Sequence, residues 1–418
     1  MNIVKNAILL SGIFIILQPY NCFPISIKVI GEYEKSGERD SILNPDNLLN
    51  RTVERGEGVI LLEGIREILG GEGVAVLRGD AQYLKAPYSS SDTEYQGQIN
   101  ELYYQRDVNN WTITLGRKKL RLGVGYSWSP TDIITRIREA SDPEDRLYHV
   151  EGTDLIKLSR IKGNGQYDLI YFPKVILEEK RLDQNRFGFR YYHYMEPVDL
   201  SLVGKLEESG RWAAGINGSL TRGEALELHG EYLYNTASDT LYPAYKENPK
   251  QFYLYFPYYR KNIGSHNLLI GGQYTMKNYW NITLEYLYNS EGYSQDEWDA
   301  YIEHIRFLNQ SYREGENYGL AISGLKSAAS VYRLPLRDHY FFARLYKENI
   351  FTSISLEWLN FIGLSDMSGF QIIQIQYTGF EKYNIYLRLQ KPWGGASTEF
   401  GLIPEDFKGI IGIFIFIG

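Results

Sequence analysis

Apolar and polar residues alternate along most of the chain, in segments of about ten residues. Between residues 280 and 288, apolar or aromatic side chains occupy the even positions, and polar side chains occupy most of the odd ones. The same alternation covers residues 198–207, 212–221 and 383–390. Because successive side chains of a β-strand point to opposite faces, each segment predicts a strand with one apolar and one wet face.

The number of these segments indicates the kind of sheet. Roughly 18 lie between Ile25 and Ile417, about 22 residues apart, which suits transmembrane strands of about 9–11 residues joined by loops. Many apolar faces end in aromatic residues, as expected for girdles at the two membrane interfaces. These residues are Tyr83, Tyr126, Trp128, Tyr232, Tyr234, Tyr274, Tyr286, Tyr288, Trp358 and Tyr377. We therefore predict an all-β fold, a single antiparallel transmembrane barrel of about 16–18 strands over residues 24–418.

The composition favours a membrane barrel over the alternative, a soluble β-sandwich or propeller. The wet faces are too polar to form a second packed layer, and 36 Tyr against 18 Phe suits a membrane interface better than a dry core. The net charge of −7 argues against a nucleic-acid partner, because such proteins carry a basic excess. The one cysteine is Cys22, so a mature chain that begins after it has no disulfide, cysteine-bound zinc or covalent haem.

Residues 1–23 have the pattern of a secretory signal peptide. Lys5 supplies a positive start, and the apolar run at residues 7–17 is too short to span a bilayer. No later apolar run is long enough to predict a transmembrane helix. The residues before Cys22 fit a cleavage site poorly, and lipidation at Cys22 is the weaker alternative. We expect export to the outer membrane of a Gram-negative bacterium, with membrane lipid as a partner.

Two stretches interrupt the strand pattern. Residues 294–308 carry apolar side chains at helical spacing, and Ser294 with Glu297 has the capping-box pattern, which predicts a helix within a long loop. Residues 129–145 include a candidate short helix at 132–139. Either stretch would form a constriction or plug if it folded into the lumen. We expect both to lie on the extracellular rim instead.

The densest group of basic side chains follows Gly116. The parity of the apolar positions changes there, as a β-bulge would cause, and this change turns Lys119 and Arg121 toward the lumen. The lipid-facing positions of the continued strand are then Leu120, Leu122, Val124, Tyr126 and Trp128. Cations at a constriction select anions, which gives one hypothesis for this group. Together with other charges on wet faces, the candidate pore-lining residues are Arg117, Lys119, Arg121, Lys205, Glu227, His229, Glu231, Glu285, Arg344, Glu357 and Arg388.

The six histidines do not predict catalysis. None lies in a G-x-S-x-G or H-E-x-x-H pattern. His229 shares a strand face with Glu227 and Glu231, and a satisfied network in the lumen explains this group better than a hydrolase site. We therefore expect no enzyme activity, no cofactor and no metal site.

Several segments resemble porin-like outer-membrane barrels of the alginate-export type and related uncharacterised barrels. Residues 116–132 (GRKKLRLGVGYSWSPTD) form a basic strand that runs into a Ser-Pro-x-Asp loop, and residues 142–158 follow it. Residues 267–293 and 397–404 are similar to the closing hairpins of that group. The resemblance covers the chain from about Val74 to the C-terminus, and it implies an outer-membrane channel without catalytic residues.

The predicted function is a passive channel for small polar or anionic solutes. The alternative is a structural barrel that surrounds or anchors an exported partner, such as a cytochrome conduit or a polymer-export complex, and has little open pore of its own. The last strand departs from the usual pattern, because residues 409–417 are apolar on both faces and the terminal residue is not aromatic. We expect one of these faces to pack inside the barrel, against an N-terminal segment or an inserted loop.

Overall fold

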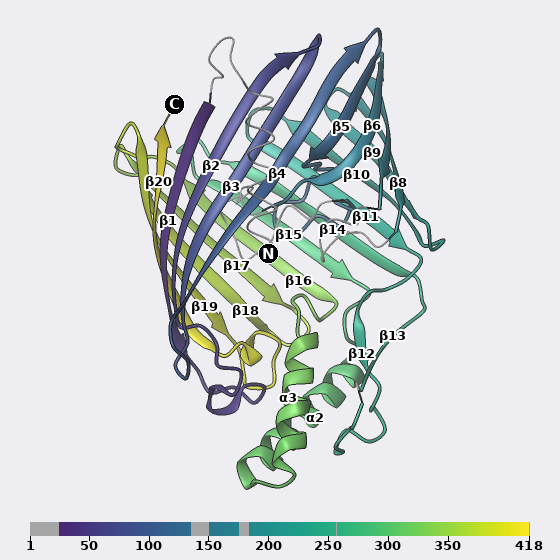
Figure 1. Cartoon of the computed structure of the whole chain (residues 1–418). Coiled ribbons are helices and arrows are strands. Elements are labelled where there is room, and N and C mark those ends of the chain that lie inside the picture. The colour runs from purple at the N-terminus through teal and green to yellow at the C-terminus, as the bar shows by residue number, and fades with distance from the viewer. Residues whose placement is uncertain (1–24, 135–149, 175–183, 256, 418) are drawn as a thin grey trace.

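The computed structural model describes residues 25–134, 150–174, 184–255 and 257–417. Within these residues, eighteen strands form one closed sheet, in which each strand pairs antiparallel with the next and β1 pairs with β20 to complete the ring (Figure 1). The predicted all-β fold and the predicted single barrel of 16–18 strands are confirmed. The predicted signal peptide lies outside the described residues.

The barrel strands differ in length, and those near the N-terminus are the longest. They are β1 (Ile25–Glu38), β2 (Glu54–Ile68), β3 (Gly71–Lys85), β4 (Asp92–Val108), β5 (Trp111–Lys118), β6 (Thr153–Lys162), β7 (Gly165–Phe172), β8 (Arg186–Met195), β9 (Val198–Glu207), β10 (Trp212–Arg222), β11 (Leu226–Asn235), β14 (Ser265–Thr275), β15 (Asn281–Asn289), β16 (His339–Lys347), β17 (Ile354–Gly363), β18 (Ser368–Tyr377), β19 (Tyr383–Trp393) and β20 (Glu405–Ile417).

The outer face of the barrel is apolar in the way that the alternation predicts. Leu387 on β19 pairs with Ile375 on β18 and with Ile411 on β20, and all three side chains are 44–54% exposed. The neighbouring Arg388 belongs to the opposite, inner face and is buried. A row of exposed apolar side chains on a closed barrel matches a surface that contacts lipid.

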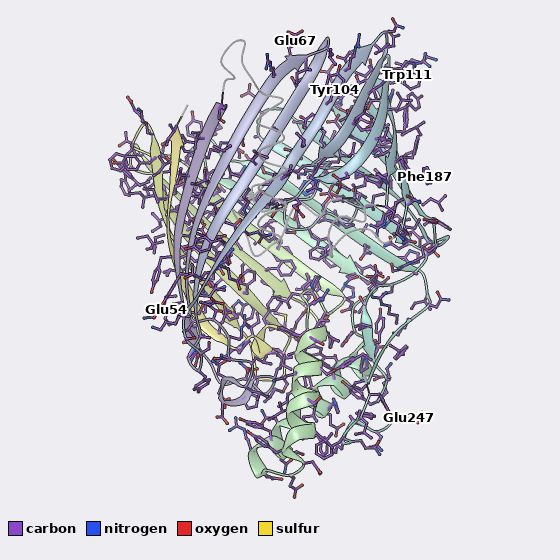
Figure 2. All side chains as sticks on the ribbon, in the orientation of Figure 1. Glu54, Glu67, Tyr104, Trp111, Phe187 and Glu247 are labelled. Carbon is purple, nitrogen blue, oxygen red and sulfur yellow. The ribbon has the colours of Figure 1, made fainter. Side chains whose placement is uncertain are left out.

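The two ends of the barrel differ in the length of their connections. Turns are short at the end of the barrel where β1 begins and β20 ends. For example, only Leu69 and Gly70 join β2 to β3, and both have the positive φ that a two-residue hairpin requires. Most connections at the other end are longer, and Figure 2 shows Glu67 and Glu54 of β2 at these opposite ends. Since outer-membrane barrels have short periplasmic turns and long extracellular loops, the long-loop end is extracellular.

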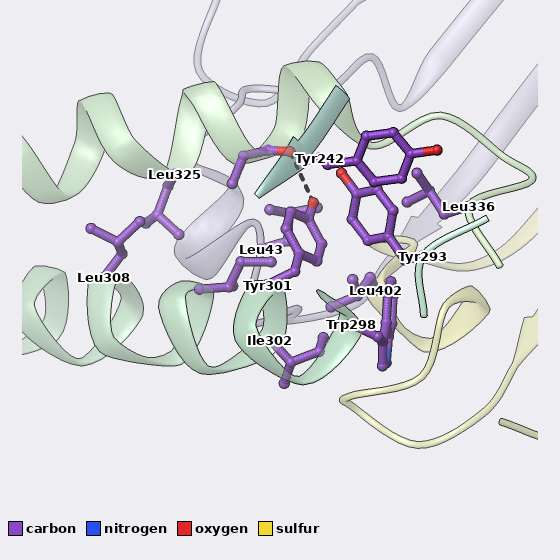
Figure 3. Packing of buried hydrophobic residues seen from close by; sticks show 12 residues of the cluster. Leu43, Tyr242, Tyr293, Trp298, Tyr301, Ile302, Leu308, Leu325, Leu336 and Leu402 are labelled. Atoms are coloured by element: carbon purple, nitrogen blue, oxygen red, sulfur yellow. Dashed lines mark hydrogen bonds between the residues drawn. The ribbon is translucent and has the colours of Figure 1, made fainter. Parts of the chain in front are cut away.

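Four of the long loops build a folded cap at that end (Figure 1). The cap contains a small hairpin of β12 (Leu241–Pro243) and β13 (Tyr258–Arg260), the helices α2 (Gln295–Glu314) and α3 (Tyr318–Val331), and the short helices η1 (Pro45–Asn47) and η2 (Phe400–Leu402). Leu43, Tyr242 and Leu402 come from three different loops and share one buried cluster with α2 and α3 (Figure 3). Neither α2 nor α3 is long and apolar enough to cross a membrane.

The predicted helix at 294–308 is confirmed, and it is longer than the pattern indicated. Ser294 and Glu297 form the expected capping box, and α2 ends at Gly315, whose φ of 74° only glycine adopts readily. It lies in the cap beyond the rim, as expected, and does not plug the barrel. The second helix, α3, was not predicted.

The inner face of β20 is apolar and packs against neighbouring strands. Phe414 packs against a buried cluster that includes Ile30 and Val59, and it stacks on Tyr386 at 5.4 Å between ring centroids. The predicted internal packing is thus supplied in part by the barrel wall itself. The wall was not among the predicted partners, and the chain before β1 lies outside the described residues.

Candidate functional site

The chain leaves the barrel wall directly after β5. The predicted strand through Trp128 is wrong from Lys119 onward, because residues 119–134, here called the crossing segment, form no strand. Gly116 marks the irregularity, with a φ of 119° and with Leu102 O only 2.3 Å from where a Cβ would stand. A side chain at this position would collide with the backbone of β4, so glycine is required here.

The middle of the crossing segment reaches the far wall. Its backbone binds Glu231 of β11 and Glu285 of β15. Since β12 and β13 lie outside the ring, β15 is eight strands from β5 in a ring of eighteen, which is almost the opposite side. A segment that leaves β5 and contacts the inner faces of these strands must cross the interior.

Two carboxylates hold the middle of the crossing segment through its backbone. Glu231 Oε1 accepts from the N–H groups of Val124 at 2.6 Å and Gly125 at 2.5 Å. Glu285 accepts from the N–H groups of Tyr126 at 2.6 Å and Ser127 at 2.7 Å. These N–H groups have no strand partner, and a charged acceptor satisfies them strongly.

The end of the crossing segment folds back on the same anchor. Thr131 donates its N–H and its hydroxyl to Glu231 Oε2, at 2.9 and 2.7 Å. Asn217 on β10 donates to Leu122 O at 2.9 Å and to Thr131 Oγ1 at 2.7 Å. Asp132 Oδ1 accepts from Leu122 N at 2.6 Å, which closes the segment into a compact turn.

Tyr126 provides a third contact with the wall. Its hydroxyl donates to Glu357 Oε1 at 3.3 Å, and the guanidinium of Arg344 lies 4.6 Å from the centre of its ring. Arg344 Nε also pairs with Glu357. The crossing segment therefore contacts β10, β11, β15, β16 and β17 and narrows the lumen at this level.

The prediction that Leu120 and Leu122 face lipid is wrong. These side chains are only 9% and 5% exposed, and Leu120 packs against Leu155 and Phe172 on the inner face. The chain leaves the sheet after Lys118, so the alternation of apolar residues beyond this point does not mark a strand. The expectation that residues 129–145 lie on the rim is also wrong for their described part, since Ser129 and Thr131 bind Glu231 inside the barrel. The candidate helix at 132–139 lies mostly outside the described residues.

Most of the sequence-predicted site residues lie on inner faces, and five of them come together. His229, Glu231, Glu285, Arg344 and Glu357 are neighbours along the wall that receives the crossing segment. His229 Nε2 lies 2.7 Å from Glu285 Oε1, whereas its Nδ1 is 3.8 Å from Glu227, so the network centres on Glu285 rather than on Glu227.

The other candidates lie apart from this group. Arg117 makes a two-pronged ion pair with Asp154 at 2.9 and 3.1 Å. Arg121 donates to Gly125 O at 3.1 Å, within the crossing segment, and Lys119 uses its backbone N–H to bind Glu101. Of the remaining two, Lys205 pairs with Glu207 at 2.9 Å, and the buried Arg388 donates to Gln374.

Sequence reasoning missed the residues that fasten the crossing segment. Ser127, Thr131, Asp132 and Asn217 are small polar residues of the kind found in any loop or wet strand face. The only local signal was the pair Gly123 and Gly125, where a Cβ would stand 1.6 Å from Ser129 Oγ and 2.0 Å from Trp128 O. Among the described residues, no group of three or more His, Cys, Asp or Glu side chains is arranged to hold a metal ion.

Comparison with known proteins identifies the fold. No family model and no curated protein matches the sequence. Among solved structures, OccK7 of Pseudomonas aeruginosa gives a TM-score of 0.55 at 9% identity, over 95% of this chain and 99% of that one. OccK5 of the same organism gives 0.54 at 8% identity, over 94% and 98%. OccAB1 of Acinetobacter baumannii gives 0.51 at 11% identity, over 94% and 96%.

Identities this low establish the fold alone. The predicted resemblance to porin-like outer-membrane barrels is confirmed at that level, and the narrower likeness to alginate-export barrels stays a prediction. The apolar outer face agrees with the predicted localisation in an outer membrane. The chain therefore has the fold of the porin-like β-barrels of Gram-negative outer membranes.

Proposed function

We propose that the protein is a passive channel through which small polar solutes cross the outer membrane. The observation that carries the proposal is the crossing segment, which leaves the wall at β5 and is bound by Glu231 and Glu285 on the far side. A segment so placed narrows a polar lumen without any contribution from the cap helices. Size and polarity at this level would then decide which solutes pass.

The charge preference of the channel is a finer part of the proposal. Arg117 forms ion pairs with Asp154 and Glu151. The predicted anion-attracting field would come from Lys119 and Arg121. Carboxylates at Glu231, Glu285 and Glu357 lie on the opposite wall. Selectivity would therefore depend on which wall the solute path follows.

Single-channel conductance of the refolded protein in a planar bilayer tests the proposal. Steady, ohmic conductance in potassium chloride is the expected result. Protein with verified β content that gives no conductance would contradict a channel and would favour the alternative predicted from the sequence, a barrel that surrounds or anchors an exported partner. Co-purification of the full chain from membranes would then identify that partner.

A further inference from the structure

A cavity of about 500 Å³ lies between the crossing segment and the cap. Trp128 and Pro130 of the crossing segment line it, together with Asn235 on β11, Asn267 on β14 and Asn289 on β15. The end of α3 (Ser330 and Val331) and residues 333–336, which lead from α3 to β16, line it from the cap. We call this cavity the vestibule. A solute that approaches the crossing segment from outside the cell would enter it first.

The charges around the vestibule balance. Among the described residues, four basic and four acidic ones line it: Lys205, Arg211, Arg260 and Arg333, with Asp132, Glu207, Asp239 and Glu291. Several are already paired with one another. Lys205 lies 2.9 Å from Glu207, and Arg211 lies 3.0 Å from Asp239. The described part of the lining therefore has no net formal charge that would attract an ion of either sign.

Three asparagines on the strands of its wall have unused hydrogen-bonding groups. Asn267 and Asn289 stand directly opposite each other on β14 and β15, and the Asn267 side chain makes no hydrogen bond within the described residues. Asn289 uses its Oδ1 to accept from Glu291 N, which leaves its NH₂ group. Asn235 uses its NH₂ to bind Ser265, which leaves its Oδ1. Each free amide offers neutral donors or acceptors at a fixed place on the wall.

Apolar surface adjoins these amides. Trp128, Pro130 and Leu233 also line the vestibule. An indole ring is large and amphipathic, so it suits a solute that has both C–H faces and hydroxyl groups. Most of the charged side chains of the lining are already paired, so a charged solute would lose hydration here with little opposite charge to gain in exchange.

We propose that the vestibule binds a neutral, polyhydroxylated solute of mono- or disaccharide size. Its hydroxyl groups pair with the amides of Asn235, Asn267 and Asn289, and its C–H face lies on Trp128. A volume of about 500 Å³ falls within the range that binds small ligands. This inference rests on the proposed channel function and names the solute class that such a channel would admit.

Two measurements on the full chain test the proposal. The first is calorimetric titration of the refolded protein with maltose, in a detergent that has no sugar headgroup. The second is block of the single-channel current by maltose added on the extracellular side. The expected result is saturable binding and block by maltose, with at least tenfold weaker binding of glucose 6-phosphate and of glucosamine.

Asn267→Leu removes the free amide and should weaken maltose binding at least tenfold while the potassium chloride conductance stays close to that of the wild type. Gln273→Leu is the matched control, because Gln273 lies on the same inner face of β14 but outside the vestibule. Equal binding of charged sugars, or equal loss in both variants, would overturn the proposal. If maltose binds but no ion current is seen, the channel function fails and the binding site stands.

Discussion

Glu231 accepts both the backbone N–H and the hydroxyl of Thr131, although Thr131 belongs to a segment that starts on the other side of the barrel. The same carboxylate also accepts from Val124, Gly125 and Ser129. One side chain thus receives five hydrogen bonds from a stretch that has no regular secondary structure. The position of the crossing segment depends on this carboxylate more than on any other group that the structure describes.

Glu231→Gln should loosen the crossing segment. A glutamine keeps one acceptor oxygen but turns an NH₂ group toward donors, so several bonds to a charged acceptor are lost at about 1.5–3 kcal/mol each. We expect single-channel conductance to rise and to fluctuate between levels, with the barrel still folded.

Glu227→Gln is the control for this experiment. Glu227 lies on the same face of β11 but makes no contact with the crossing segment in the described structure. Wild-type conductance and noise in Glu231→Gln would show that the crossing segment does not limit the current. A loss of barrel content in circular dichroism would instead mark a folding defect, and Thr131→Val then tests the same contact from the other side.

Replacing Lys119 and Arg121 with glutamate tests the anion hypothesis. The change moves four units of charge near the start of the crossing segment, where the low-dielectric walls strengthen the field. We expect the reversal potential in a potassium chloride gradient to shift toward cation selectivity. Lys162→Glu, on the exposed periplasmic end of β6, changes charge outside the lumen and should leave the potential unaltered. An unshifted potential in the double variant removes the basic group from the selectivity mechanism.

The sequence predicts the wall of this barrel well because the relevant signal is local. Leu387 faces lipid and Arg388 faces inward because successive side chains of a strand point to opposite faces, which two adjacent residues are enough to show. The crossing segment alternates in the same way, yet it leaves the sheet. Its partners Glu231 and Glu285 lie 107 and 159 residues further along the chain from the groups they bind, so no local pattern shows them.

The cap shows the same division between local and distant causes. A capping box and an apolar stripe in the sequence predict α2, and the helix is found there. By contrast, α3 is rich in small residues and has no side-chain cap at Asn317. It is stabilised by packing on α2, where the lack of a side chain at Gly324 makes room for Leu308. That close approach depends on both helices, so the sequence of either helix alone does not predict it.

Leu308→Ala should destabilise the cap without altering the channel. Leu308 is almost fully buried and faces Leu325 across the two helices (Figure 3). Loss of a buried leucine side chain costs about 2–5 kcal/mol. We expect faster hydrogen exchange or proteolysis in α2 and α3, with wild-type conductance. Lys326→Ala, on the exposed side of α3, is the control. A slower or equal exchange rate would mean that the cap core does not depend on this contact.

A buried carboxyl group joins the cap to the barrel rim. Glu399, between β19 and β20, accepts from Leu336 N at 2.5 Å and from the Tyr340 hydroxyl at 2.8 and 2.9 Å. It is fully buried, and Asp366 adds a second carboxylate nearby. Burial raises the pKa of Glu399 from 4.5 to about 7, against the opposing effect of its hydrogen bonds.

This shift predicts that the junction loses stability as the pH rises. Between about pH 4.5 and 7 the folded protein holds a proton that the unfolded chain releases, so the free energy of unfolding falls across that window, by roughly 3 kcal/mol in total. Glu399→Gln keeps an acceptor for Leu336 and Tyr340 and carries no charge at any pH. The variant should therefore match the wild type near pH 4.5 and be more stable at pH 8. Hydrogen exchange at residues 395–404, compared between pH 5 and pH 8 with exposed Glu247→Gln as control, measures the difference (Figure 2). A stability gain in Glu399→Gln that is the same at both pH values would contradict the titration of Glu399 as its cause.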